Sequence, residues 1–325
     1  MKAPRFWHND GLIPLLFSPL GVMYGKACQY YFSCITPWKP PIPVICVGNI
    51  VAGGAGKTPI AMDIGQRLAS QGVTTHFLSR GYGGHLKGPV LVDPARHSAR
   101  EVGDEPLNLA RFAPTWISRK RILGVKAAAN AGAEAVVMDD GFQNPYLEKN
   151  LSLLVIDAEY GVGNGRVIPA GPMREPLSAA LERADVLVVL GKIRKLPAWL
   201  NADKPIHRAV IIPGPEFKNF RGKRVLAFSG IGRPKKFFNL LRSCGANVVA
   251  SFEFPDHHFF SESEIVWLKR RASDLKAILV STEKDVARLS PSDKKEIEVL
   301  TVSIFWHDEM AIEELLVRQC VGGKC

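Results

Sequence analysis

One glycine-rich stretch combines the residue types that bind phosphate. It spans 43–59, PVICVGNIVAGGAGKTP, and its β-branched run 44–47 predicts a buried strand. A tight loop follows, and its backbone N–H groups can converge on an anion. The residues of this loop are Gly53, Gly54, Ala55 and Gly56. The segment 60–70 then predicts a helix whose positive dipole end faces the loop.

Strand, loop and helix in this order predict a P-loop for a nucleoside triphosphate. Lys57 is expected to reach the β- and γ-phosphates, and Thr58 to coordinate Mg²⁺. The match is imperfect, because the strict pattern has glycine where this chain has Val51. A glycine-rich turn that binds nothing is the alternative, but the flanking strand and helix favour a nucleotide site.

Two adjacent acids, Asp139 and Asp140, follow the apolar strand predicted at 135–138. Neighbouring like charges repel, so this pair is unfavourable at a strand end unless a cation lies nearby. Carboxylates hold Mg²⁺ beside a P-loop, directly or through water. The pair therefore indicates a metal site, and a solvated strand end is the weaker alternative.

A second set of residues could move a proton. Asp104 lies in GDEP before a predicted helix, where it could be a free carboxylate or a helix N-cap. His257 and His258 lie in FPDHH, where a histidine could equally be structural. An Asp and a His brought together across two domains would make a general base with a tuned pKa. The sequence leaves open which of the two histidines would pair with Asp104.

Arginines and a glutamate complete the polar set. Arg80 begins a glycine-rich turn after a predicted strand, and Arg174 and Glu175 lie in PAGPMREP. Arginines near a P-loop neutralise the charge of a transferred phosphoryl group. Surface salt bridges are the alternative for both arginines.

These residues are expected to be positioned by an α/β fold. Strands alternate with helices, which predicts a parallel sheet of the P-loop NTPase type with helices on both faces. Ligands then gather at the carboxyl ends of the strands, where each polar cluster above lies. We expect a P-loop kinase domain over 1–212, a linker at 213–220, and a smaller α/β domain over 221–325 that closes over the nucleotide. A last strand is expected at 299–304.

The composition narrows the partners and the compartment. A formal net charge of +11 favours an anionic partner, namely nucleic acid, a phosphorylated substrate or an anionic lipid, although a basic surface can also serve solubility. The chain has six cysteines and no C-x-x-C spacing, which fits a reducing, cytoplasmic compartment.

The N-terminal segment, about 1–38, is unusually apolar. Between 11 and 38 the only charge is Lys26, yet two prolines interrupt the run, so we expect neither a membrane-spanning helix nor a signal peptide. Leu16, Leu20 and Met23 fall on one helical face. A helix lying at a membrane interface is favoured slightly over one that packs back onto its own domain.

The motifs taken together resemble one enzyme family. GGAGKTP, SRGYGG, GDEP, DDGFQ, IPAGPMREP, FSGIGRP, FPDHH and STEKD occur in this order, as in the tetraacyldisaccharide 4'-kinases of lipid A biosynthesis. The resemblance covers most of the chain. It implies transfer of a phosphoryl group from MgATP to the 4'-hydroxyl of a tetraacylated glucosamine disaccharide 1-phosphate, which gives lipid IVA.

The resemblance also implies roles for individual residues. It makes Asp104 the general base with support from His257, and it puts Lys57 and Thr58 on the phosphates and the metal, beside Asp139 and Asp140. The residues that it puts near the substrates are Glu105, Arg121, Gln143, Arg174 and Glu175. The family usually has histidine after DDGFQ, where this chain has Asn144, so no imidazole can act there.

The resemblance finally implies a peripheral protein at the cytoplasmic face of the inner membrane of Gram-negative bacteria, with a lipid substrate. We expect a monomer and no nucleic-acid partner, because the chain shows no recognisable DNA- or RNA-binding module. A membrane-recruited P-loop ATPase of the partitioning type is the alternative function. Such loops often carry a lysine before the two glycines, where this chain has Ala52.

Overall fold

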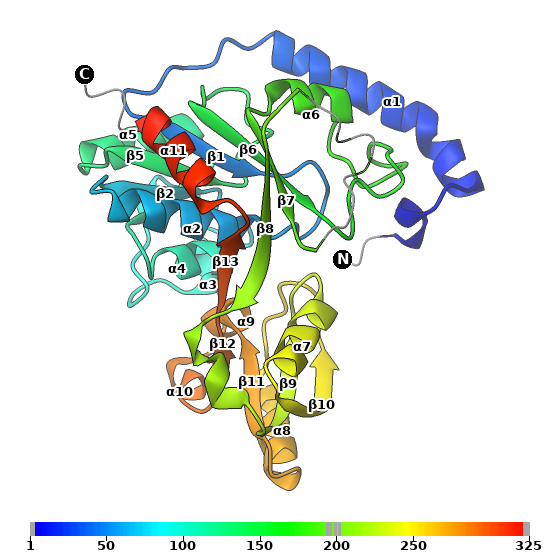
Figure 1. Ribbon diagram of the computed structural model, residues 1–325, viewed down its shortest axis with the longest axis vertical. Coiled ribbons are helices and arrows are strands. Elements are labelled where there is room, and N and C mark those ends of the chain that lie inside the picture. Colours follow the sequence, from blue (N-terminus) through cyan, green and yellow to red (C-terminus); the bar gives the residue numbers. More distant parts are fainter. Residues whose placement is uncertain (1–3, 193–196, 198–199, 201–202, 321–325) are drawn as a thin grey trace.

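Two β-sheets organise the computed structural model, which describes residues 4–192, 197, 200 and 203–320. Figure 1 shows them as a large upper unit and a small lower unit, joined by long strands. Both units alternate strands with helices, so the expected α/β class is confirmed.

The large sheet has nine strands in the order β13-β8-β7-β6-β1-β5-β2-β4-β3. Its strands are β1 (Val44–Gly48), β2 (Thr75–Ser79), β3 (Val90–Leu91), β4 (Thr115–Ile117), β5 (Ala135–Asp139), β6 (Leu151–Asp157), β7 (Val186–Leu190), β8 (Ile206–Pro213) and β13 (Val302–Trp306). All neighbours are parallel except at the two edges, where β3 and β13 run antiparallel. β1 lies between β5 and β6, so the loops that follow these three strands are neighbours.

Helices cover both faces of the large sheet because its strands are apolar on both sides. Ile45 and Val47 face α2 (Lys57–Ser70) and α11 (Glu309–Cys320). Val44 and Cys46 face α5 (Arg121–Asn130) and α6 (Leu177–Arg183). The short helices α3 (Ala99–Val102) and α4 (Asp104–Leu109) follow β3.

The N-terminal segment forms η1 (Arg5–His8) and a continuous helix, α1 (Leu12–Ser33), on the outer flank of the large unit (Figure 1). This helix buries a narrow stripe that includes Gly21 and Gly25. A Cβ atom at Gly21 would lie 2.7 Å from the carbonyl oxygen of Val167, so the close packing requires glycine there. Among the described residues, no helix combines the length and the apolar character needed to cross a membrane.

The small sheet has four parallel strands in the order β10-β9-β11-β12. These strands are β9 (Arg224–Ser229), β10 (Asn247–Glu253), β11 (Ile278–Thr282) and β12 (Glu298–Leu300). The associated helices are η3 (Pro215–Phe220), α7 (Pro234–Ser243), α8 (Glu262–Asp274), α9 (Glu283–Ala287) and α10 (Pro291–Lys294). α7 covers one face of this sheet and α8 the other.

The end of the chain departs from the expected division. The strand expected at 299–304 is two strands, with β12 in the small sheet and β13 in the large one. α11 packs on the large unit as well, so β13 and α11 do not belong to the small unit. Ile304 and Trp306 are buried in the large core, and the Trp306 indole donates to Asp63 at 2.7 Å. Because these two side chains are buried there, β13 lies in the large sheet and not in the small one.

Several connections join the units within the described part of the chain. β8 was not anticipated by the sequence analysis, and it pairs with β13 as a two-stranded ribbon between them (Figure 1). Nearer the centre, α4 of the large unit packs against α9 of the small unit. Phe259 and Ala287 of the small unit pack on the apolar cluster that includes Val102 and Leu107. The carboxyl edge of the large sheet is thereby brought against the small unit.

Candidate active site

The predicted P-loop has the backbone that its glycines suggest. Gly53 and Gly56 have φ of +119° and +78°, and Gly56 is the left-handed N-cap from which α2 begins at Lys57. Val51 stands where the strict pattern has glycine. It is a core residue, 3% exposed, and forms an isolated β-bridge with Met173. The first half of the loop is thus held by packing, and the glycine-rich second half remains open.

Lys57 lies across the loop from two polar partners. Its Nζ donates to Asn49 Oδ1 at 3.0 Å and lies 3.5 Å from Asp140 Oδ1. Asn49 is fully buried and also donates to the Val51 carbonyl at 2.8 Å. The sequence analysis did not single out Asn49, because its contact with Lys57 forms only when the loop folds back.

The two adjacent acids have different surroundings. Asp140 has φ of +55° and pairs with both Lys57 and Arg174. Burial would raise its pKa, but these two positive charges outweigh burial and lower it. Asp139 is 1% exposed, and neither carboxylate oxygen has a hydrogen-bond partner within the described part of the chain. Burial, reinforced by the charge of Glu105, raises the pKa of Asp139 to about 7.

Arg174, Gln143 and Glu175 form a hydrogen-bonded chain beside the P-loop. Arg174 donates to Asp140 at 3.0 Å and to the Gln143 side-chain oxygen at 3.1 Å. The Gln143 amide donates to Glu175 at 3.1 Å and to the Asn49 carbonyl at 2.9 Å. Glu175 is 2% exposed and also binds Arg183 at 2.5 Å, a partner that the sequence analysis did not single out.

The Asp104–His257 pair forms across the two units. Asp104 begins α4 and is 4% exposed, and its Oδ2 lies 3.1 Å from His257 Nδ1. His258 turns away: its Nε2 lies 3.0 Å from Glu264, and its ring stacks on Phe254. The histidine that faces Asp104 is therefore His257.

The surroundings of this pair lower the pKa of Asp104 and raise the pKa of His257. Burial would raise the pKa of Asp104, but the hydrogen bond of His257 and the charges of Arg288 and Lys284 hold it well below its usual range. The hydrogen bond to Asp104 raises the pKa of His257 against the opposing effect of burial. The ionised carboxylate and the imidazole thus stabilise each other.

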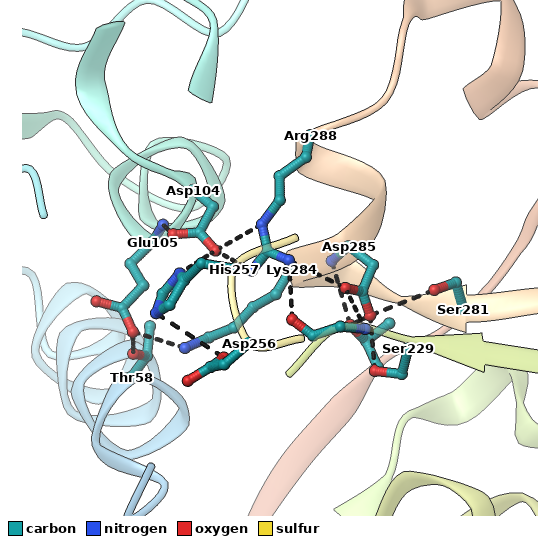
Figure 2. A network of polar contacts seen from close by, with 12 residues as sticks. Thr58, Asp104, Glu105, Ser229, Asp256, His257, Ser281, Lys284, Asp285 and Arg288 are labelled. Atoms are coloured by element: carbon teal, nitrogen blue, oxygen red, sulfur yellow. Dashed lines mark hydrogen bonds and ion pairs between the residues drawn. The ribbon is translucent and has the colours of Figure 1, made fainter. Parts of the chain in front are cut away.

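Glu105 links the P-loop to the small unit, as Figure 2 shows. Its Oε1 accepts a hydrogen bond from the Thr58 hydroxyl at 3.4 Å and one from Lys284 at 2.6 Å. The Lys284 charge lowers the pKa of Glu105. Lys284 and Arg288 were not singled out from the sequence, although Lys284 lies in the STEKD motif.

Arg121 and Arg80 form a basic patch near the same edge. Arg121 is 4% exposed, and it donates to the Ser118 carbonyl at 2.6 Å. Its Nε has no hydrogen-bond partner among the described residues. Burial, with the neighbouring charge of exposed Arg80, lowers the pKa of Arg121 to about 10. A bound anion would offset both the loss of hydration of Arg121 and its repulsion by Arg80.

The structure therefore brings the predicted residues into two clusters at one edge of the large sheet. The first holds the P-loop with Lys57 and the two acids, and the second holds Asp104 with His257. Glu105 connects them, because it contacts Thr58 and is adjacent to Asp104. Such a site can bind a triphosphate at one end and accept a proton at the other.

Comparisons with known proteins agree with this arrangement. The family model described as tetraacyldisaccharide-1-P 4'-kinase matches residues 13–320. The tetraacyldisaccharide 4'-kinase of Rhodospirillum centenum is 49% identical over 99% of this chain and 98% of its own length. That of Rhodospirillum rubrum is 46% identical, with 99% of both chains covered.

A solved structure shows the same fold. The crystal structure of LpxK from Aquifex aeolicus in complex with ATP superposes on this chain with a TM-score of 0.78 at 26% sequence identity. The superposition covers 95% of this chain and 100% of the LpxK chain. The fold and the full-length sequence matches agree with the order of motifs along the chain. The chain belongs to the tetraacyldisaccharide-1-P 4'-kinase family.

Proposed function

We propose that this kinase transfers the γ-phosphoryl group of ATP to the 4'-hydroxyl of a tetraacyldisaccharide 1-phosphate, which gives lipid IVA. The observation that carries the proposal is the Asp104–His257 pair, held at the same edge as the P-loop in a chain of this family. A partitioning ATPase would need no such pair, and the family match does not favour that alternative.

The proton of the sugar hydroxyl goes to the Asp104–His257 pair. A hydroxyl is a weak nucleophile, so a positioned base must accept its proton as the bond to phosphorus forms. Asp104 is the base in this proposal, and His257 supports it through the contact of 3.1 Å between its Nδ1 and Asp104 Oδ2. The Asp104 side chain is 4% exposed, which keeps competing water away from the carboxylate.

The triphosphate binds in the P-loop. The backbone of Gly53, Gly54, Ala55 and Gly56 surrounds it, and the N-terminal end of α2 favours its negative charge. Lys57 neutralises the β- and γ-phosphates, and Arg174 adds a second positive charge from the other side of Asp140. Gln143 and Glu175 act indirectly, because they hold Arg174 and the Asn49 backbone in place.

Magnesium fits the residues present. The two unpartnered oxygens of buried Asp139 are the ligands that a hard cation prefers. Asp140 follows Asp139 in the chain, and the Thr58 hydroxyl at the start of α2 is a further oxygen ligand that the cation could use. Within the described ranges, no three or more His, Cys, Asp or Glu side chains are gathered to hold a metal alone. That suits an ion that enters with the nucleotide and is held partly by its phosphates, where it would neutralise phosphoryl charge.

The lipid approaches from the membrane side. We propose that Arg80 and Arg121 contact anionic groups of the lipid, and that Glu105 stays with Thr58 and Lys284. α1 exposes a row of apolar side chains, and a row of this kind suits a peripheral helix at the inner-membrane surface. Its most exposed apolar residues are Leu12, Leu16, Met23 and Tyr30. We further propose that the chain acts as a monomer.

The test is phosphate transfer from γ-labelled ATP to tetraacyldisaccharide 1-phosphate in detergent micelles. Label should appear in the lipid with the wild type, and it should fall by about 10²-fold or more in Lys57→Ala and Asp104→Ala. Matched controls are Lys269→Ala and Asp93→Ala, which remove a charge from distant ion pairs. ATP hydrolysis without labelled lipid would support the ATPase alternative instead.

A further inference from the structure

Arg288 is a buried arginine that contacts the candidate base, Asp104. It follows α9 directly as its C-cap, and its side chain is 1% exposed. A guanidinium group loses much hydration when it is buried, so its partners must replace that hydration. Arg288 makes no contact with the P-loop, and nothing in the proposed reaction uses it yet.

The partners of Arg288 lie on both units. Its Nε donates to Asp104 Oδ2 at 2.9 Å, and its second terminal nitrogen contacts the same oxygen. The remaining terminal nitrogen donates to the Gly230 carbonyl at 3.0 Å and to Asp285 Oδ1 at 3.1 Å. Figure 2 shows the guanidinium between the two carboxylates.

The same carbonyl also orients the histidine. The backbone N–H of His257 donates to the Gly230 carbonyl at 3.0 Å, and His257 has φ of +58°, which a non-glycine residue adopts only when its surroundings impose it. Arg288 thus contacts one member of the pair directly and shares a carbonyl with the other. Both His257 and Arg288 approach Asp104 Oδ2, while Oδ1 accepts the Glu105 N–H at 3.0 Å.

Asp285 makes this arrangement rigid. It is fully buried and accepts hydrogen bonds from Ser229 at 2.7 Å, from the Gly230 N–H at 2.9 Å and from Thr282 at 2.7 Å. Since these donors belong to the small unit, Asp285 fixes the Gly230 turn and Arg288 to the same body. Asp104 alone belongs to the large unit.

We propose that Arg288 is a positioning residue, which orients the Asp104 carboxylate and the His257 ring and does so only while the small unit is packed against α4. This inference rests on the proposed role of Asp104 and His257. It predicts that the pair loses its alignment when Arg288 is removed, even though neither catalytic side chain has changed.

The charges that face the pair determine how Arg288 affects its titration. They come from His257 and Asp256 on one loop, from Lys284, Asp285 and Arg288 at α9, and from Glu105 on α4. Arg288 lowers the pKa of both Asp104 and His257. Without Arg288, the Asp104 carboxylate should bind a proton at higher pH.

The experiment compares full-length Arg288→Met, Arg288→Ala and Arg288→Lys with wild type. The matched control is Arg111→Ala, which breaks a contact of 3.1 Å between the end of α4 and Glu283 of α9 without touching Asp104. In Arg288→Met, kcat should fall by about 10²-fold, while KM for ATP changes by less than about threefold. The acidic limb of kcat/KM should move to higher pH by about one unit.

Two further variants separate positioning from general support of the fold. Guanidinium ion should restore part of the activity of Arg288→Ala, because it can occupy the vacated space. Arg288→Lys keeps the charge but cannot contact Asp104 and Gly230 together, so its pH profile should stay near that of wild type with a lower kcat. Loss of activity with an unshifted pH profile and no rescue would assign Arg288 to stability alone and overturn the inference.

A readout independent of the kinase reaction completes the test. The imidazole resonance of His257, assigned with a His257→Gln variant, can be titrated by NMR in wild type and in Arg288→Met. Lost alignment weakens the hydrogen bond to Asp104 that raises the pKa of His257, so this pKa should fall in Arg288→Met. A rise, as expected if only the charge of Arg288 were lost, or an unchanged titration would contradict the inference. If the wild type labels no lipid, the proposed function fails, but the NMR titration still decides the role of Arg288.

Discussion

At the scale of single residues, Asp104 and Asp139 are buried carboxyl groups with opposite electrostatics. Asp104 has three cationic neighbours, and its pKa is held far below the usual range. Asp139 has no hydrogen-bond partner among the described residues, and its pKa rises to about 7. Pairs of acids whose environments separate their pKa values mark different chemical tasks. Here the low pKa keeps Asp104 ionised at neutral pH, whereas the unpartnered oxygens of Asp139 leave room for a cation, whose charge would lower the pKa of Asp139.

The raised pKa of His257 makes a prediction about stability. An unfolded histidine titrates near about 6.5, so its interaction with Asp104 is fully present below that pH and is lost as the pH rises through the folded value. His257→Gln should therefore melt at a lower temperature than wild type at about pH 5.5, and the gap should narrow by about pH 8.5. Calorimetry at both pH values measures the gap.

His258→Gln is the comparison for this prediction. It also removes a histidine–carboxylate contact, but one with Glu264 at the surface rather than with buried Asp104. A His257→Gln gap that stayed constant across this pH range would show that the imidazolium form contributes nothing to folding.

At the scale of elements, α1 and α9 each have two faces with different surroundings. α1 turns Gly21 and Gly25 toward the segment 167–176, which carries Arg174 and Glu175, and leaves Leu16, Leu20 and Met23 exposed. In α9, Glu283 and Lys284 contact the large unit. Asp285 instead holds the Gly230 turn of the small unit. α9 is thus a connector between the units, whereas the buried face of α1 packs on the large unit.

The exposed face of α1 predicts membrane binding. Burying one leucine or methionine side chain is worth about 1.5–3 kcal/mol, and each 1.4 kcal/mol is about tenfold in affinity. Replacing Leu16, Leu20 and Met23 together by serine should reduce binding to anionic vesicles by about 10²-fold or more, as measured by co-sedimentation.

Val266→Ser tests whether any exposed apolar residue has this effect, because Val266 is 59% exposed on α8 of the small unit. It should leave vesicle binding unchanged. Equal binding by the wild type and the triple-serine variant would exclude α1 as the membrane contact.

At the scale of the whole molecule, the two units meet at two separate polar contacts. One joins α4 to α9 and includes Arg288, and the other joins Asp157, at the end of β6, to Arg233 and Lys236 at 2.7 Å each. The β8–β13 ribbon also connects the units (Figure 1). We infer that the ribbon permits closure and that the polar contacts determine where closure stops.

Closure predicts nucleotide-dependent crosslinking. In a background with Cys28, Cys34 and Cys325 replaced by serine, the pair Arg111→Cys and Glu283→Cys should crosslink in higher yield when a non-hydrolysable MgATP analogue is present. The analogue favours the packed arrangement if that arrangement binds it better. The crosslinked fraction on a gel is the measurement.

Lys269→Cys with Asp293→Cys is the control pair, since both residues lie in the small unit. In the native chain Lys269 Nζ lies 2.8 Å from Asp293 Oδ1. Its yield should not respond to nucleotide. Equal yields for the Arg111–Glu283 pair with and without the analogue would indicate that the units do not move on binding.

Local patterns in the sequence determined the P-loop, the acids at the end of β5, and the parallel α/β class. The reason is that a strand, its loop and the next helix are contiguous, so residue type and spacing alone specify them. Even the departure at Val51 left the loop recognisable, because the glycines with positive φ lie after it.

Only the tertiary structure decided which histidine faces Asp104, which arginine contacts that pair, and which sheet contains β13. Asp104 lies 153 residues before His257 and 184 before Arg288. Contacts over such separations depend on how two sheets are oriented, and no local pattern encodes that orientation. The same holds for β13, whose strand propensity matched either sheet until the burial of Trp306 against Asp63 placed it in the large one.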